Sequence, residues 1–292
     1  MTLLEEKLGK DQQLESFFQQ WGLNGDPFSL ELPTPKAFVP IQRGDMLKIL
    51  QLMRECKLGI LTGGLGMGKT TVCEFLVAAL REESLLVSDP SQQVIPVLVR
   101  GAAYKTADEF LRAMVLGLGM DADKDSATLF ETLRRWSQEH QEKLAVIVDD
   151  VPERAANLQE IGEFLRVLAD LPSISLLLNG EFKQMKEFLA KVPALLDRVQ
   201  LHVVIRPLDF AQTKELLELR LRHSGCTNCD GLLTLDGVQA VQKISRGVPR
   251  SALKAASNSL LYASRSNSVL DSRSVKKANR RSLASRLLPF LR

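Results

Sequence analysis

The sequence predicts an α/β fold, in which helices cover both faces of a parallel sheet and a small all-helical lid follows. Between residues 44 and 208, short apolar runs alternate with helical patterns. Such alternation is typical of a parallel sheet that is buried on both sides. A glycine-rich loop joins the first apolar run to a helix, and after Pro207 only helical patterns remain. These observations indicate an α/β domain and then a helical region.

The elements are predicted in a regular order. Residues 1–43 carry a helix at 14–20 and then four prolines, which favour an extended path because proline lacks an N–H group. Residues 44–208 form the α/β domain, with strands at 58–62, 94–100, 144–149, 174–178 and 202–206. Its helices are predicted at 69–81, 107–118, 126–141, 154–170 and 181–190. Residues 209–292 form the helical lid and a basic C-terminal segment, with helices at 210–223, 236–245, 249–264 and 271–287.

The composition excludes several classes of protein. The chain has 292 residues, of which 45% are hydrophobic and 25% charged, as in ordinary globular proteins. No apolar run approaches the ~20 residues that span a bilayer, and the polar N-terminus is unlike a secretory signal. Four cysteines are too few for a disulfide framework, so we expect a cytoplasmic protein. Cys226 and Cys229 supply half of a zinc site without a second pair, and we interpret them as structural or incidental thiols.

The charge is distributed unevenly along the chain. The formal net charge is +3, but residues 250–292 contain ten Lys or Arg and one acid, a net charge of +9. Such a segment is either a solvated basic surface or a contact for nucleic acid or another polyanion, because clustered cations gain from counterion release on a phosphate backbone.

A phosphate-binding loop is the most specific signal. The stretch GGLGMGKT fits the pattern G-x-x-x-x-G-K-[ST] at every fixed position and lies between an apolar strand and a helix. Backbone N–H groups of such a loop and the helix N-terminus bind phosphates. Lys69 would reach the β- and γ-phosphates of ATP, and the Thr70 hydroxyl would bind Mg²⁺. The residues expected to contact the nucleotide are Gly63, Gly64, Leu65, Gly66, Met67, Gly68, Lys69, Thr70 and Thr71.

Two carboxylates end a later apolar strand, AVIVDD at residues 145–150. Asp149 is expected to orient the Mg²⁺ shell, and the next residue normally polarises the attacking water. That residue is Asp150, one methylene shorter than the usual Glu, and a displacement of about 1 Å can reduce a rate about a hundredfold. Glu153 is the alternative for this role, although a carboxylate three residues further on also suits a helix N-terminus. The pair Asp149 and Asp150, with the shorter side chain at the second position, therefore predicts slow ATP hydrolysis.

At these motifs the sequence resembles the AAA+ ATPases with a P-loop NTPase fold, in particular the bacterial group that includes ExeA/GspA-type ATPases and the transposition ATPases TniB and TnsC. The resemblance includes FFQQWGL followed by DPF, VPIQ at residues 39–42, and LLLNG at 176–180. It implies that Ile41 contacts the adenine ring, unless this residue is a plain hydrophobic staple. It also implies that Asn179 is the sensor 1 residue near the γ-phosphate, although a polar residue at a strand end can instead start a turn.

The same resemblance implies two catalytic arginines. LLDRV at residues 195–199 is similar to the arginine-finger region, where Arg198 would reach the ATP of a neighbouring subunit. Arg206 is the second candidate for this role. GVPR at residues 247–250 is similar to the sensor 2 motif, which would direct Arg250 towards the phosphates, unless this residue is an arginine at a helix start that points into solvent. An arginine supplied by a neighbour implies a homo-oligomer, either a ring or a helical filament.

These observations lead to one expected function and two alternatives. A replication initiator or loader of the origin-recognition type is disfavoured, because such proteins typically add a winged-helix domain after the lid. We expect an ATP-dependent, DNA-binding regulator that recruits a transposase to double-stranded target DNA and hydrolyses ATP slowly. An ExeA-like role in secretion or cell-envelope assembly is the first alternative. The second is a nucleotide-gated scaffold with negligible turnover, which only kinetics distinguishes.

Overall fold

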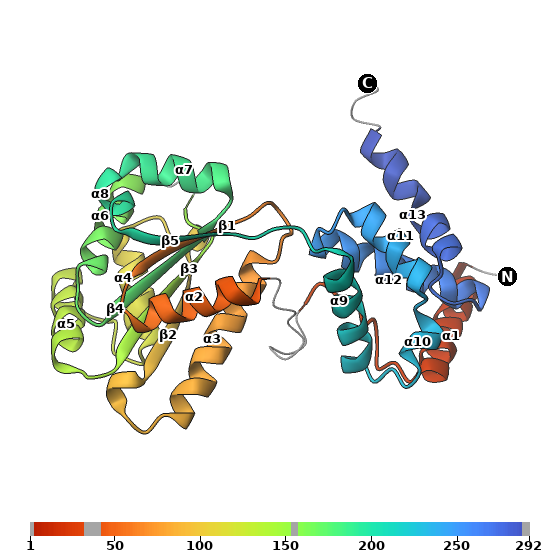
Figure 1. Cartoon of the computed structure of the whole chain (residues 1–292), viewed down its shortest axis with the longest axis horizontal. Coiled ribbons are helices and arrows are strands. Elements are labelled where there is room, and N and C mark those ends of the chain that lie inside the picture. Colours follow the sequence, from red (N-terminus) through yellow and green to blue (C-terminus); the bar gives the residue numbers. More distant parts are fainter. Residues whose placement is uncertain (1–2, 32–41, 153–156, 288–292) are drawn as a thin grey trace. The chain divides into compact units, whose positions relative to one another are not determined.

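The computed structural model describes residues 3–31, 42–152 and 157–287, with side chains in 12–31, 42–152 and 157–280 (Figure 1). The chain divides into two compact units, which are described separately. One unit is Gln42–Arg206, and the other combines Met1–Ile41 with Pro207–Arg292.

The unit Gln42–Arg206 contains a five-stranded sheet in which every strand pair is parallel. The strand order is β2-β3-β4-β1-β5. The strands are β1 (Leu58–Thr62), β2 (Val94–Arg100), β3 (Lys143–Asp149), β4 (Ile174–Gly180) and β5 (Val199–Val204). The predicted parallel sheet, with helices on both faces, is therefore confirmed.

The sequence of each strand suits its place in the sheet. The central strands β3 and β4 read as continuous apolar runs because both of their faces are buried. β2 carries Pro96, which is tolerated because this strand lies at an edge. β5, at the other edge, alternates between half-buried and exposed residues along most of its length.

Helices cover the two faces of the sheet (Figure 1). A single apolar core joins one face to the helices that follow β2, β3 and β4. These are α4 (Ala107–Gly117), α5 (Ser126–Glu139), α6 (Leu158–Ala169), α7 (Phe182–Lys191) and α8 (Pro193–Leu196). The opposite face carries α2 (Arg43–Arg54) and α3 (Lys69–Leu86). There the absence of a side chain at Gly59 lets Leu52 of α2 approach, since a Cβ would lie 3.1 Å from it.

The second unit consists of helices. They are α1 (Leu3–Trp21), α9 (Phe210–His223), α10 (Cys229–Leu232), α11 (Leu235–Ser245), α12 (Pro249–Ser266) and α13 (Ser272–Leu287). Phe17, Leu23 and Phe28 are buried in the same core as the apolar side chains of α9, α11 and α12. The aromatic residues of the N-terminal motif are thus packing residues of this unit.

A buried amide attaches α13 to α12. The Asn279 side chain donates to the carbonyl oxygen of Ala255 over 3.2 Å and to the Ser259 hydroxyl over 3.3 Å. Because a buried amide without partners costs free energy, these bonds specify one seating of α13 on α12. Among the described residues, no helix is long and apolar enough to cross a membrane.

Candidate nucleotide site

The phosphate loop lies between β1 and α3. Gly66 and Gly68 have φ angles of 77° and 87°, a left-handed conformation that glycine adopts at little cost. Gly68 is the residue immediately before α3, so the loop ends where the free N–H groups of the helix begin. The Leu65 side chain at the loop tip is 72% exposed. The loop therefore has the local geometry of an anion site at a helix N-terminus.

Lys69 lies over this loop. Its side chain is only 8% exposed, and its ammonium group donates to the carbonyl oxygens of Gly63 at 3.1 Å and Gly64 at 3.3 Å. These neutral acceptors do not neutralise a buried ammonium group. The loop therefore holds a positive charge that an anion can compensate.

Three elements meet at the carboxylate of Asp149, the last residue of β3. The Thr70 hydroxyl, from the first turn of α3, donates to Oδ1 of Asp149 over 3.1 Å. The Asn179 amide, near the end of β4, donates to the same oxygen over 2.5 Å. Burial raises the pKa of Asp149 and the charge of Asp150 raises it further, whereas the bonds from Thr70 and Asn179 oppose the shift. The structure therefore brings together three residues that the sequence places far apart.

Asn179 has unused hydrogen-bonding capacity in this site. Its side chain is fully buried, and its Oδ1 atom has no partner among the described residues. Its Nδ2 atom also contacts the sulfur of Cys73 at 3.3 Å, on the second turn of α3. An orphaned buried acceptor beside the phosphate loop is the type of atom that a bound water or ligand satisfies.

Asp150 has an unusual backbone. Its φ angle is 57°, in the left-handed region, where Asp and Asn are tolerated better than longer residues. This conformation gives a physical reason for Asp rather than Glu at this position. A Cβ at Gly101 would lie 2.5 Å from the Asp150 carbonyl oxygen, so Gly101 is required for this close approach. Glu153, the alternative water-orienting residue, lies outside the described residues.

Gln184 is a positioning residue that the sequence did not reveal. From α7, its amide donates to the carbonyl oxygen of Val151 over 2.6 Å, and its side-chain oxygen accepts from the N–H group of Glu181. It thereby fixes the chain immediately after Asp150. A lone Gln on a helix carries no recognisable motif, and only the fold brings it to this loop.

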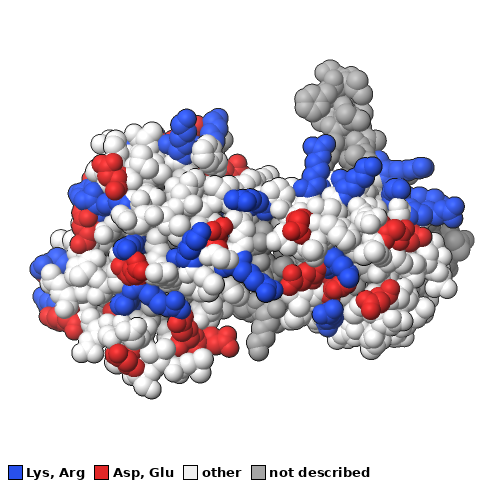
Figure 2. All heavy atoms as spheres, viewed as in Figure 1, with Lys and Arg blue, Asp and Glu red and all other residues white. Residues whose placement is uncertain are grey.

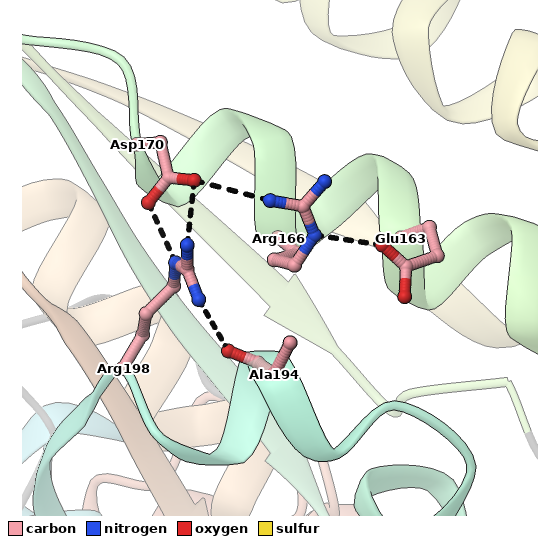
Figure 3. A network of polar contacts seen from close by, with 5 residues as sticks. All are labelled: Glu163, Arg166, Asp170, Ala194 and Arg198. Carbon is pink, nitrogen blue, oxygen red and sulfur yellow. Dashed lines mark hydrogen bonds and ion pairs between the residues drawn. The ribbon is translucent and has the colours of Figure 1, made fainter.

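The two candidate arginine fingers have different surroundings. Arg198 lies between α8 and β5 and is paired with Asp170 of its own chain, at 2.6 Å between Nε and Oδ1 (Figure 3). The side chain of Arg206 is exposed, and its backbone N–H donates to the Gln42 side chain over 3.0 Å. Neither arginine forms a hydrogen bond or ion pair with Thr70, Asp149 or Asn179, and the role of each as an arginine finger stays a prediction.

The remaining predicted contacts stay predictions. Arg250 is an exposed residue in the first turn of α12, after Pro249, and belongs to the helical unit. Ile41 lies outside the described residues. No group of three or more His, Cys, Asp or Glu side chains that could hold a metal ion occurs in the part of the chain that the structure describes. Cys226 and Cys229 therefore belong to no such group among the described residues, and their side chains pack against the helical core.

Comparison with known proteins places this site in a family context. The family model described as "AAA domain" matches residues 52–199. No curated protein matches the sequence at a significant level.

Solved structures show the same fold. The ORC2 protein of Aeropyrum pernix, in ADPNP-ADP complexes, aligns with a TM-score of 0.69 and 16% identity over 88% of this chain and 72% of that chain. The ORC1 protein of the same organism, in complex with DNA, aligns with a TM-score of 0.62 and 19% identity over 86% of this chain and 68% of that chain. Cdc6p of Pyrobaculum aerophilum aligns with a TM-score of 0.65 and 17% identity over 89% of this chain and 71% of that chain. At these identities the likeness concerns the fold.

Proposed function

The chain belongs to the AAA domain family of P-loop NTPases, and on this premise we propose that it binds Mg²⁺-ATP, assembles with copies of itself and hydrolyses ATP slowly as a switch. The convergence of Thr70 and Asn179 on Asp149 is the observation that carries this proposal. It supplies oxygen ligands and a polar amide next to a loop suited to phosphates.

The residues present fit ATP and Mg²⁺. The hydroxyl of Thr70 and the carboxylate of Asp149 are oxygen donors, which Mg²⁺ prefers. The ion would neutralise charge on the phosphates. The N–H groups of the loop and the ammonium group of Lys69 would bind the phosphates, with Thr71 in the same helical turn. The unsatisfied oxygen of Asn179 would accept from a water molecule beside them.

Slow turnover follows from Asp150. Its carboxylate is one methylene shorter than that of Glu, and it is attached to a backbone in the left-handed region. Both features favour a water-orienting group that is imperfectly placed. A long-lived ATP state suits a switch better than a motor.

The helical unit offers a surface for DNA. Arg273, Lys276, Lys277 and Arg280 of α13 are exposed and follow the spacing i, i+3, i+4 and i+7, which places them on one face of the helix. Lys and Arg side chains gather over this helix in Figure 2. None of the four forms an ion pair with a residue in the described part of the chain. On the opposite side, Val275 and Asn279 are buried.

This cationic stripe, defined as those four residues, has the chemistry of a contact for the DNA backbone. Because it lies on a helix that is anchored to α12, the phosphates would meet a rigid row of charges. The solved ORC1 protein of Aeropyrum pernix with a similar fold was captured in complex with DNA. Together with the resemblance to transposition ATPases, this supports a regulator that recruits a transposase to double-stranded DNA.

The ExeA-like alternative draws mainly on the N-terminal aromatic motif. Because Phe17, Leu23 and Phe28 form part of the helical core, packing accounts for the motif without an envelope partner. No observation among the described residues favours this ExeA-like role over the DNA-binding role.

Co-sedimentation with duplex DNA tests the proposal, in ATP, ADP and a non-hydrolysable analogue at several salt concentrations. We expect assembly on DNA in ATP. A plot of the logarithm of the DNA-binding constant against the logarithm of the salt concentration should have a slope of about −0.9 for each cation that contacts a phosphate. Replacing Lys276 and Lys277 by Gln should flatten this slope by about 1.8. The matched control replaces Lys183 and Lys186, exposed lysines of α7, and should leave it unchanged. Absence of DNA binding in every nucleotide state would eliminate the DNA-binding role.

A further inference from the structure

Arg198 is occupied within its own chain (Figure 3). Its Nε atom donates to Oδ1 of Asp170 over 2.6 Å, and its Nη2 atom donates to Oδ2 over 2.8 Å. Its Nη1 atom donates to the carbonyl oxygen of Ala194 over 2.6 Å. All three guanidinium nitrogens therefore have an acceptor in the single chain. A side chain bound in this way has to exchange partners before it can serve another subunit.

The position of these acceptors explains the geometry. Asp170 is the residue at the C-terminal end of α6, and Ala194 lies in the short helix α8. Arg198 thus bridges two helices: it binds the side-chain carboxylate at the C-terminal end of α6 and a main-chain carbonyl oxygen of α8. This arrangement leaves the Arg198 side chain partly exposed.

The pair is strong enough to orient Arg198 but weak enough to open. The bidentate geometry is the most favourable one for Arg and a carboxylate. However, the side chains of Arg198 and Asp170 are 32% and 46% exposed, so water screens their attraction. Nearby Arg198 lowers the pKa of Asp170, which keeps this carboxylate charged at neutral pH. A nucleotide phosphate carries more charge than one carboxylate and would compete well for the same guanidinium group.

A second arginine allows this exchange without leaving a charge unpaired. Arg166 donates from Nη1 to Oδ2 of Asp170 over 3.2 Å, the same oxygen that Arg198 contacts. Glu163 holds Arg166 in place, because the Nε atom of Arg166 donates to Oε2 of Glu163 over 2.7 Å. If Arg198 leaves, Asp170 therefore keeps a cationic partner.

We propose that Asp170 retains Arg198 in the unassembled chain, and that Arg198 moves to the nucleotide phosphates of an adjoining copy of the chain on assembly, while Asp170 stays paired with Arg166. Asp170 is thus a positioning residue that sets the threshold for assembly. This inference rests on the proposed role of Arg198 between subunits.

The test measures ATP turnover as a function of protein concentration in Asp170→Asn. Releasing Arg198 raises the fraction of competent chains, so the concentration that gives half-maximal turnover should fall, by about fivefold. The maximal turnover per subunit should stay unchanged. Arg166→Gln should shift the half-maximal concentration upward, because Asp170 would then lose its remaining partner when Arg198 leaves.

Glu131→Gln is the matched control. It breaks a comparable surface pair, Glu131 with Arg134 at 2.6 Å on α5, and should change neither quantity. Thermal melting verifies that each variant is folded. If Asp170→Asn reduces maximal turnover to the level of Arg198→Ala, or leaves the half-maximal concentration unchanged, the proposed exchange is wrong. If Arg198→Ala itself retains full turnover, the role of Arg198 between subunits fails instead.

Discussion

Asn179 donates its amide to the same oxygen of Asp149 that accepts the hydroxyl of Thr70, with distances of 2.5 and 3.1 Å. One carboxylate oxygen therefore joins β3, β4 and α3. Because β3 and β4 are neighbouring strands of the sheet and α3 packs on the sheet, the fold positions these polar groups before any nucleotide binds. Such preorganisation is the main way in which proteins stabilise charge that develops during a reaction.

The first prediction concerns the amide of Asn179. In Asn179→Ala we expect kcat to fall by about 10²-fold or more, the size of effect seen when one preorganised polar group is removed, because the variant loses both the bond to Asp149 and the oxygen that would accept from a water molecule. Nucleotide affinity should change little, because the loop and Lys69 remain. Asn279→Ala is the control, since it removes an equally buried amide from the helical unit. That variant should lose stability while its nucleotide affinity is kept. Equal effects of the two variants on kcat would show that Asn179 acts only through stability.

The second prediction concerns nucleotide binding at Lys69. Mg²⁺-ATP at 100 times its Kd should stabilise the wild-type protein by about 2.7 kcal/mol, because it binds only the folded state. Lys69→Ala should lose most of this stabilisation, and chelation of Mg²⁺ should reduce it in the wild type. Thermal melts with and without nucleotide measure both effects. An unchanged shift in Lys69→Ala would contradict the proposed phosphate site.

The third prediction separates the charge of Asp150 from its backbone. Asn tolerates the left-handed region as Asp does, so Asp150→Asn should preserve the free energy of unfolding to within about 0.5 kcal/mol. If Asp150 orients the attacking water, turnover should fall at the same time. Steady-state kinetics and denaturant unfolding measure the two effects. Wild-type turnover in Asp150→Asn would transfer the role to another group, with Glu153 as the first candidate.

The fourth prediction concerns the close approach of Gly101 to Asp150. In Gly101→Ala the new Cβ would lie 2.5 Å from a backbone oxygen and 2.9 Å from the Val148 side chain. The backbone around Asp150 has to shift, which should cost about 1–3 kcal/mol of stability and also reduce turnover. Gly44→Ala is the control, because nothing lies within 4 Å of a Cβ there. Calorimetry measures the stability of both variants, and turnover assays measure their activity. Equal results for Gly101→Ala and Gly44→Ala would contradict the prediction.

The sheet could be predicted because its strands carry clear local signals. The apolar runs at 58–62 and 94–100 match β1 and β2 to the residue. The start of β5 was predicted too late, at residue 202, because this edge strand places Gln200 in solvent and its apolar run is interrupted. Helix α1 begins well before the predicted residue 14, since its first half is polar and lacks a clear periodic pattern.

The site was only partly accessible from the sequence. The loop and Asp149 belong to motifs with fixed spacing, and Asn179 was reached through the family resemblance. The partners of these residues carry no such signal. Asp170 and Arg198 are 28 residues apart, and Gln184 and Val151 are 33 apart. Contacts over such separations depend on how the strands are ordered in the sheet. The left-handed backbone at Asp150 likewise has no signature in the sequence.

A mixing experiment tests the central claim, that two subunits complete one site, most directly. Lys69→Ala impairs nucleotide binding but keeps Arg198, whereas Arg198→Ala binds nucleotide but lacks the arginine. Each variant alone should be nearly inactive in the presence of ATP and duplex DNA. Mixed in equal amounts, they should recover up to about a quarter of the wild-type rate, because half of the subunits bind nucleotide and half of those adjoin a donor of Arg198. A mixture that is no more active than the average of its two components would contradict a site shared between subunits.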